Sequence, residues 1–446
     1  MTIRTTAAVL FIFLAAVYNA NGREIASYDS QPAKLAAREL LQRGTLTLNY
    51  VVGTTPQLLE RAPFVAAADG NYRSAYSPAP SVLAAAVTFP FYATGMVDIR
   101  APLAASLIAK TAASLLTAAA VVFLLLTAAH WTSSSRALWI ALAAGIGTGY
   151  WTTVSQTLWQ HESAALGLSI AVWALARPVE LTPRTAALLG IGLGLAGISR
   201  AQLSIAAAVL LLGAFAISRP RMAAISAAIV GAFAAALVAI NVRWFGHPLG
   251  ALPLLESLHP TVHATEGSFQ PSLDGLAGLL LAPSRGLLIY SPVVGVALAG
   301  LPLALRGGRR SPIFWCAAAA VCQYLFYGSY TVWWGGHTYG PRYMLDVLPL
   351  LVPVAAAFVS SLRLTPVTRA IAGAALAWSV SVAATGAFEY PNERWNVDPR
   401  DVDRNHERLW DWTDLQIVRC WERGPDPMNF RLMSRAATRY QPASEN

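Results

Sequence analysis

Long apolar segments recur from one end of this chain to the other, and they limit its possible folds more than any other feature. A helix that crosses a bilayer needs about 20 mainly apolar residues, within a range of about 17–25. Only 12% of the residues are charged, against about 25% in an average globular domain. The sequence therefore predicts an all-α polytopic membrane protein with about eleven transmembrane helices, at residues 5–20, 103–129, 137–154, 160–176, 185–199, 201–217, 222–242, 286–305, 312–329, 343–361 and 369–387.

The arginines between these segments predict the topology. Cytoplasmic loops carry an excess of lysine and arginine, so the links that hold the arginines are expected inside and the N-terminus with them. The C-terminus is then outside. The net charge of +9 needs no nucleic-acid partner, because no basic stripe or binding motif is present. The arginines concerned are Arg136, Arg177, Arg184, Arg219, Arg221, Arg306, Arg309, Arg310, Arg363 and Arg369.

Two further apolar stretches have alternative interpretations. Residues 80–97 are apolar, but a crossing there would move every later arginine cluster to the outside. Pro80 and Pro90 suit a broken helix in the membrane interface, which we favour over a true span. Residues 1–20 could be a signal peptide. The sequence at Asn19–Asn21 is a poor small-residue cleavage site, which favours a retained first span.

This topology predicts a transmembrane domain at residues 1–387 and a short periplasmic tail at 388–446. The outer loops comprise residues 21–102, with amphipathic or interfacial helices, and residues 243–285 and 330–342, whereas the inner links are short. We therefore expect the active site on the outer face. No internal repeat or matched pair of broken helices is visible, which counts against an inverted-repeat transporter. The tail is too small for a catalytic domain of its own.

The first outer loop begins with an acidic residue and two cations. A helix is expected from about Asp29 to Gly44, which closes it. Lys34 and Arg38 are four residues apart and share a face, which can hold a lipid phosphate. Asp29 is either a simple helix cap or a general base. A general base typically accelerates a reaction about 10²–10⁴-fold.

Three arginines are predicted at the outer ends of spans, where a guanidinium can bind phosphate through two hydrogen bonds. They are Arg200, Arg285 and Arg342. Arg342 follows Gly340 and Pro341 and opens the tenth predicted span, where a helix N-terminus would add backbone donors. The alternative is that these side chains contact only lipid headgroups.

Aromatic and histidine side chains suggest a substrate pocket nearby. Trp333, Trp334, His337 and Tyr339 precede the tenth span and could bind a sugar ring, although tryptophan and tyrosine also form aromatic belts at interfaces. His161 and Glu162 open the fourth span and could position an acceptor, or be a surface polar pair. We expect no cofactor; a zinc-compatible spacing is formed by Glu256, His259, His263 and Glu266, but Pro260 interrupts it.

An acidic residue just after the first span, opening a large outer loop, resembles the GT-C fold membrane glycosyltransferases. This superfamily includes the protein O-mannosyltransferases and the aminoarabinose transferases. The stretches YRSAYSPAPSVLAAAVTFPFY, SQTLWQHESAALGLSIAVWALAR and WWGGHTYGPRYMLDVLPLL are also similar to it. The resemblance covers most of residues 1–387, but its motifs are degenerate and indicate the fold more than the substrate. Many members carry two adjacent acids where this chain has Asp29 alone.

The resemblance implies a glycosyltransferase of the bacterial inner membrane, which moves a hexose or pentose from a polyprenyl-phosphate donor. The acceptor would be a hydroxyl of a lipid, glycan or protein on the periplasmic face. Asp29 would be the general base, and the arginines would stabilise the leaving phosphate. No nucleotide-binding motif is visible. The alternative is a lipid or polysaccharide transporter or flippase, in which ionisable groups should lie at mid-membrane rather than at the ends of the spans.

Overall fold

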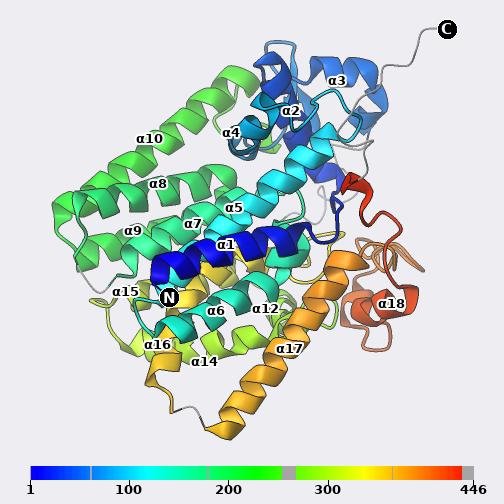
Figure 1. Ribbon diagram of the computed structural model, residues 1–446. Helices are drawn as coiled ribbons and strands as arrows, with labels where there is room; N and C mark the ends of the chain where they lie inside the picture. Colours follow the sequence, from blue (N-terminus) through cyan, green and yellow to red (C-terminus); the bar gives the residue numbers. More distant parts are fainter. Residues whose placement is uncertain (1, 61–62, 178–179, 254–267, 364, 434–446) are drawn as a thin grey trace.

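The computed structural model describes residues 2–60, 63–177, 180–253, 268–363 and 365–433 (Figure 1). The fold is a bundle of long helices, with shorter helices gathered at one end. The long and medium helices are α1 (Ile3–Asn19), α5 (Ala104–Ala128), α6 (Ser134–Ile146), α7 (His161–Leu175), α8 (Pro183–Ser199), α9 (Ser204–Ile217), α10 (Pro220–Phe245), α14 (Gly295–Arg306), α15 (Pro312–Gly328), α16 (Leu348–Ser361) and α17 (Pro366–Phe388).

Each of the predicted spans falls on helical structure, although several are composite. The span at 137–154 covers α6 and the π-helical turn η3 (Tyr150–Val154). The span at 286–305 covers α13 (Leu287–Tyr290), the turn η5 (Pro292–Val294) and α14. The span at 343–361 begins in the 3-10 turn η6 (Arg342–Asp346), before α16. In the described part of the chain, α5, α10 and α17 are long and apolar enough to cross a membrane. The total of eleven crossings stays a prediction.

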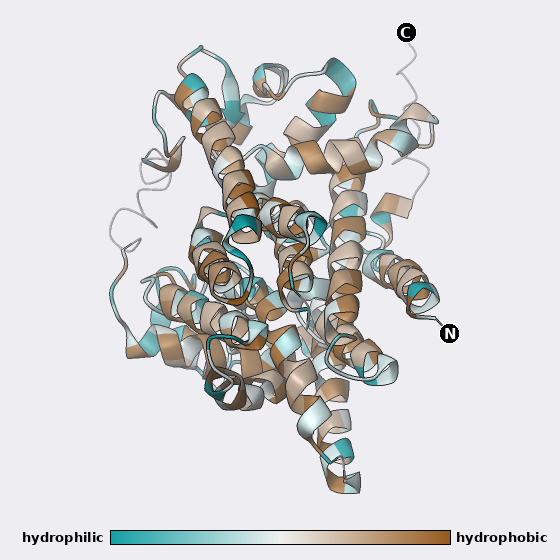
Figure 2. Ribbon diagram, turned by 90° about the vertical axis from the view of Figure 1, so that its left-hand side faces the viewer, coloured by the Kyte–Doolittle hydropathy of each residue, from teal (hydrophilic) through white to brown (hydrophobic). Residues whose placement is uncertain are grey.

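Small residues let the central helices pack closely. A Cβ atom added at Gly167 on α7 would lie 2.7 Å from the carbonyl oxygen of Gly192 on α8, and one at Gly192 would lie 2.5 Å from that of Gly167. Such contacts are typical of membrane helix interfaces. By contrast, only 11% of the most apolar 18-residue segment of α10 is buried. Figure 2 shows apolar residues along the outer helices. An exposed apolar helix of this length suits contact with lipid.

The first outer loop folds into a small layer of its own. It contains α2 (Gln31–Arg43), α3 (Asn49–Thr54), α4 (Ala79–Ala93) and an antiparallel pair, β1 (Phe64–Ala66) with β2 (Tyr72–Ser74), in the register Phe64↔Ser74. The predicted end of α2 is correct, because Gly44 takes a left-handed φ of 66°. Asp29 is not the cap of this helix. It lies in the preceding 3-10 turn, η1 (Tyr28–Ser30), whose cap is Ser27, so its carboxylate is left for other contacts.

The helix α4 occupies the stretch that was predicted to lie in the membrane interface. It packs against α2 and α5, and Figure 1 shows it beside α2 and α3 at one end of the molecule. The location of this helix in the membrane interface stays a prediction.

The tail folds back over the outer loops. It holds the turn η7 (His406–Trp410) and the helix α18 (Gln416–Arg423), beyond the end of α17 in Figure 1. Trp395 is fully buried within it, and its indole donates to the carbonyl of Asp414 at 2.8 Å. The tail also returns to the start of the first loop, where Arg23 forms an ion pair with Asp426 at 3.2 Å. The tail thus joins the first and third outer loops.

Candidate functional site

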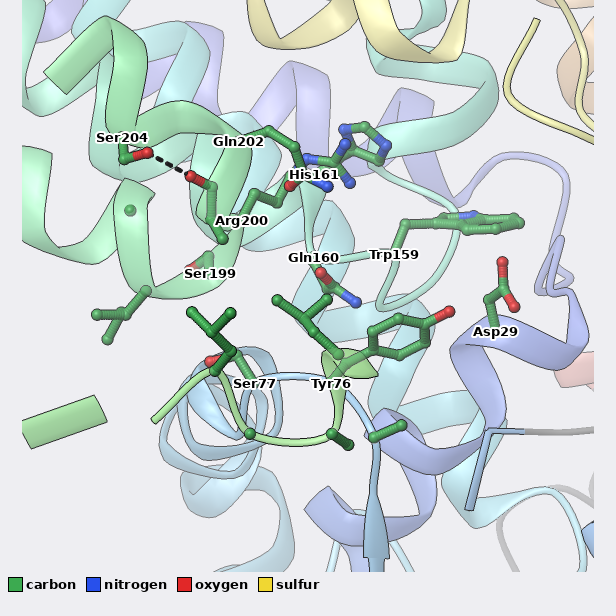
Figure 3. A pocket seen from close by; sticks show the side chains of 18 of the residues that line it. Asp29, Tyr76, Ser77, Trp159, Gln160, His161, Ser199, Arg200, Gln202 and Ser204 are labelled. Atoms are coloured by element: carbon green, nitrogen blue, oxygen red, sulfur yellow. Dashed lines mark hydrogen bonds between the residues drawn. The ribbon is translucent and has the colours of Figure 1, made fainter. Parts of the chain in front are cut away.

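A cavity of about 1420 Å³ lies between the first outer loop, the middle helices and the loop before η6. Figure 3 shows part of its wall. The apolar part of its lining comes from α8, α9 and α10, and includes Leu193, Leu211, Val230, Leu237 and Val238. The polar part includes Asp29, Tyr76, Gln160, His161, Arg200, His337 and Arg342. The cavity therefore offers one apolar and one polar environment to a ligand.

Asp29 and Arg342, which are far apart in the sequence, meet in this cavity. Arg342 Nη1 lies 4.0 Å from Asp29 Oδ2. This distance is too long for a hydrogen bond, so both groups keep hydrogen-bonding capacity for a ligand. The side chain of Asp29 is 42% exposed and that of Arg342 is 15% exposed. The carboxylate is thus open to solvent, while the guanidinium is partly buried.

The surroundings of Arg342 differ in part from the prediction. It opens the five-residue 3-10 turn η6, and α16 begins only at Leu348. An α-helix N-terminus therefore does not supply donors beside it. Its guanidinium carbon instead lies 5.3 Å from the ring centre of Trp159 and 5.5 Å from that of Tyr343. Aromatic faces attract a cation, and they orient this one.

Tyr76 is a site residue that the sequence interpretation did not single out, although its stretch carried part of the resemblance. Burial, followed by the adjacent Asp29 carboxylate, raises the pKa of Tyr76 well above its ordinary value. The phenol therefore stays protonated, and it lies beside the Asp29 carboxylate (Figure 3). Tyr76 can therefore orient the carboxylate without removing its charge.

A second polar group in the cavity wall is centred on Asp346. Its Oδ1 lies 2.8 Å from His161 Nδ1, and its Oδ2 accepts from Arg200 Nε at 2.9 Å and from the Tyr327 hydroxyl at 2.5 Å. All four side chains are buried. The charge of Arg200 is therefore balanced inside the protein, so Arg200 is a weaker candidate for the donor phosphate than the sequence suggested. Glu162 is fully buried and does not line the cavity.

The two cations of α2 do not reach the cavity. Lys34 Nζ forms an ion pair with Glu24 at 2.7 Å, and Arg38 Nη2 lies 3.1 Å from Glu39 Oε1. Lys34 is buried, because α2 packs its face against α5 rather than presenting it to a ligand. The predicted phosphate-binding face of this helix is thus occupied by acidic side chains of the same loop.

Arg285 is fully buried and lies outside the cavity. It donates to the carbonyl oxygens of Trp334 and Gly336, at 3.1 Å each. It also donates to Asn396 Oδ1 at 2.6 Å and to Gln416 Oε1 at 3.2 Å. The arginine predicted to bind phosphate therefore attaches the third outer loop to the tail.

Replacing Arg285 with Leu is expected to lower the thermal unfolding midpoint strongly. The buried oxygens that Arg285 serves would lose their donor, and each unsatisfied group costs about 1–3 kcal/mol. A thermal-shift measurement of the purified protein checks this. Arg310→Leu, at an exposed arginine, is the matched control and should leave the midpoint unchanged; equal midpoints for the two variants would contradict the role of Arg285.

The predicted aromatic residues have structural roles. Trp333 donates to Asp274 Oδ2 at 2.9 Å, Trp334 to Asp403 Oδ1 at 2.7 Å and Tyr339 to the carbonyl of Val382 at 2.9 Å. All three are buried, and none lines the large cavity. They hold the third outer loop in place, so they are not placed to stack on a sugar there.

His337 does line the cavity, beside two acids of the tail. Its Nε2 lies 3.1 Å from Asp401 Oδ1 and 3.4 Å from Asp403 Oδ2. Among the described residues, these three form the one group whose ligand atoms are close enough to hold a metal ion. The motif at Glu256, His259, His263 and Glu266 lies outside the described residues.

Comparisons with known proteins identify the fold. No family model and no curated protein matches the sequence. The crystal structure of ArnT from Cupriavidus metallidurans bound to undecaprenyl phosphate is similar, with a TM-score of 0.53 and 13% identity over 94% of this chain and 76% of that one. The archaeal oligosaccharyltransferase AglB from Archaeoglobus fulgidus, in complex with an inhibitory peptide and a dolichol-phosphate, has a TM-score of 0.50 and 12% identity over 95% of this chain and 61% of that one.

A further structure of the A. fulgidus oligosaccharyltransferase, in complex with Zn and sulfate, has a TM-score of 0.51 and 13% identity over 94% of this chain and 58% of that one. This chain thus spans about three-fifths of the length of the oligosaccharyltransferases. ArnT and AglB have the GT-C fold, and the fold that the sequence resemblance predicted is confirmed. At such low identity the similarity establishes the fold alone.

Proposed function

We propose that this chain, which has the GT-C fold, is a membrane glycosyltransferase that moves a sugar from a polyprenyl-phosphate donor to an acceptor hydroxyl. The proposal depends on one observation: the side chains of Asp29 and Arg342 lie 4.0 Å apart in a cavity that is also lined by apolar residues of α8, α9 and α10. Two solved proteins with the same fold have undecaprenyl phosphate or a dolichol-phosphate bound. A lipid-linked donor suits the combination of polar and apolar walls.

Each half of the transfer has a residue to support it. The acceptor oxygen attacks the anomeric carbon while Asp29 takes its proton. The bond from the anomeric carbon to the phosphate oxygen breaks, and its electron pair leaves with the lipid phosphate. Arg342 stabilises the negative charge of that phosphate in a site partly removed from water. The protonated Tyr76 phenol lies beside the Asp29 carboxylate and can donate a hydrogen bond that orients it.

The apolar part of the cavity suits the isoprenoid chain of the donor. Its lining residues come from α8, α9 and α10, and α10 keeps most of its apolar surface exposed. A chain held against these helices could continue directly into the bilayer. This arrangement supports a donor that is delivered by lateral diffusion within the membrane.

The proposed location is the bacterial inner membrane, with the cavity on the periplasmic face, the N-terminus in the cytoplasm and the C-terminus in the periplasm. The support is the arginine distribution, which assigns the first and third loops and the tail to the outer side. These are the segments from which Asp29, Tyr76, His337 and Arg342 reach the cavity.

Purified protein and a radiolabelled undecaprenyl-phosphate sugar test the proposal. We expect release of undecaprenyl phosphate together with transfer of the label to an acceptor from a membrane extract. Movement of the intact donor across a vesicle membrane, without its consumption, would instead support the flippase alternative.

We also propose that transfer needs no metal ion, because Arg342 already supplies positive charge at the leaving phosphate. The reaction rate after treatment with EDTA is expected to equal that of the untreated protein. A loss of activity that Mn²⁺ or Zn²⁺ restores would contradict this. If His337→Ala then raised the ion concentration needed for recovery, the ion would be assigned to His337, Asp401 and Asp403.

A further inference from the structure

Among the described residues that line the cavity, three have a buried polar atom with no hydrogen-bond partner: His161 Nε2, Ser199 Oγ and Arg342 Nε. Nearly all buried polar groups in proteins are paired, and an unpaired one costs about 1–3 kcal/mol. These three residues therefore keep hydrogen-bonding capacity that a ligand in the cavity can complete. Arg342 has been assigned to the phosphate, so His161 and Ser199 remain to be explained.

The structure holds His161 in one orientation. Asp346 is fixed by Arg200 and Tyr327, and it faces His161 Nδ1 at 2.8 Å. A carboxylate at Nδ1 selects the tautomer with the proton on that nitrogen. Nε2 is then a hydrogen-bond acceptor without a partner, on a residue that lines the cavity and is 1% exposed.

Ser199 lies on the same part of the wall. It is the last residue of α8, directly before Arg200, and it is 2% exposed. Figure 3 shows Ser199 and His161 on either side of Arg200. A hydroxyl can both donate and accept, so Ser199 can bind a group that does the same.

The chemistry of this wall selects a neutral hydroxylated ligand. The charge of Arg200 is balanced by Asp346, so His161 and Ser199 offer no net positive charge to a phosphate. One alcohol group can donate to His161 Nε2, and another can exchange a hydrogen bond with Ser199 Oγ. We propose that His161 and Ser199 bind hydroxyl groups of the transferred sugar. This inference rests on the proposed function, because it takes the sugar-lipid as the ligand.

Comparing the lipid phosphate with and without an attached sugar tests the inference. The dissociation constants of undecaprenyl phosphate and of a panel of its glucose, galactose, mannose and arabinose conjugates are measured by microscale thermophoresis. Ser199→Ala should weaken binding of the preferred conjugate about 2- to 10-fold, the size of one neutral hydrogen bond. Its affinity for undecaprenyl phosphate should not change.

The free protein supplies an independent check on folding. Ser199→Ala removes a hydroxyl that is unpaired in the structure, so its thermal midpoint should equal or exceed that of the wild type. Ser204→Ala is the matched control. Ser204 also lines the cavity (Figure 3), but its hydroxyl already donates to the carbonyl of Ala201 at 2.7 Å. Its replacement should therefore change the affinity neither for the preferred conjugate nor for undecaprenyl phosphate.

His161→Asn is the second variant. The Asn amide can keep the hydrogen bond to Asp346 that Nδ1 now makes, while Nε2 is lost. It should also weaken binding of the conjugate alone. Equal losses for both lipids in either variant, or no sugar that improves binding over undecaprenyl phosphate, would overturn the sugar subsite and leave the proposed function intact. Failure of the wild-type protein to bind any of these lipids would overturn both.

Discussion

Replacing Asp29 with Asn is expected to reduce sugar transfer by about 10²–10⁴-fold, the usual contribution of a general base. Asn has nearly the same shape but cannot accept the proton of the attacking hydroxyl. The fold should tolerate the change, because the turn around Asp29 is held by its backbone, whose N–H donates to Ser27 Oγ at 3.1 Å. The initial rate of donor consumption, at saturating donor, is the measurement.

A second acid of the same loop serves as the control. Asp69 is ion-paired with Arg73 at 2.7 Å and does not line the cavity. Asp69→Asn should therefore leave the rate unchanged. If Asp29→Asn kept more than about a tenth of the wild-type rate, Asp29 would not be the base.

Replacing Arg342 with Ala should weaken binding of undecaprenyl phosphate by about 10- to 150-fold. This corresponds to the loss of a hydrogen-bonded contact with a charged group, worth about 1.5–3 kcal/mol. Arg342→Lys should recover part of the loss, because it keeps the charge but cannot form two parallel hydrogen bonds with a phosphate. The dissociation constant of the sugar-free lipid is the quantity to measure.

Arg38→Ala is the matched control for this experiment. The sequence suggested both arginines as phosphate ligands, but the structure pairs Arg38 with Glu39 and places it off the cavity. Its replacement should leave the affinity unchanged. Equal losses for Arg38→Ala and Arg342→Ala would show that the lipid phosphate does not bind where the structure suggests.

The positions of the helices could be predicted because the signals for them are local. An apolar segment of sufficient length forms a helix wherever its ends lie, and Gly44 ends α2 because glycine adopts the left-handed conformation without strain. The resemblance to the GT-C fold used the same kind of signal, namely the order and spacing of segments. Asp29 and Arg342 were found as candidates because each stands beside a predicted span.

The roles of individual cations could not be predicted in this way. Arg200, Arg285 and Arg342 look alike in the sequence, since each was expected at the outer end of a helix. The structure separates them by their partners. Asp346 balances Arg200, and carbonyl and amide oxygens surround Arg285. Aromatic rings flank the partly buried Arg342, whose nearest carboxylate, Asp29, lies 4.0 Å away. Two partners of Arg285, Asn396 and Gln416, come from the tail, which a local pattern cannot connect to it.

The sequence interpretation missed two residues for the same reason: their roles depend on remote partners. Tyr76 contributes through its contact with Asp29, and Asp403 through its contacts with His337 and Trp334. Neither stands in a motif with a chemical meaning of its own. A search for polar residues beside the Tyr-Pro stretch could have found Tyr76, but its partner would have stayed unknown.

By itself, the sequence determined where this chain forms helices, which fold they build and that a carboxylate and a guanidinium stand near the ends of predicted spans. Hydrophobic length and backbone preference act over short stretches, so they can be read along the chain. The tertiary structure alone decided which charges are neutralised and which remain available in the cavity. That outcome depends on distances between remote residues, which the packing of the helices sets.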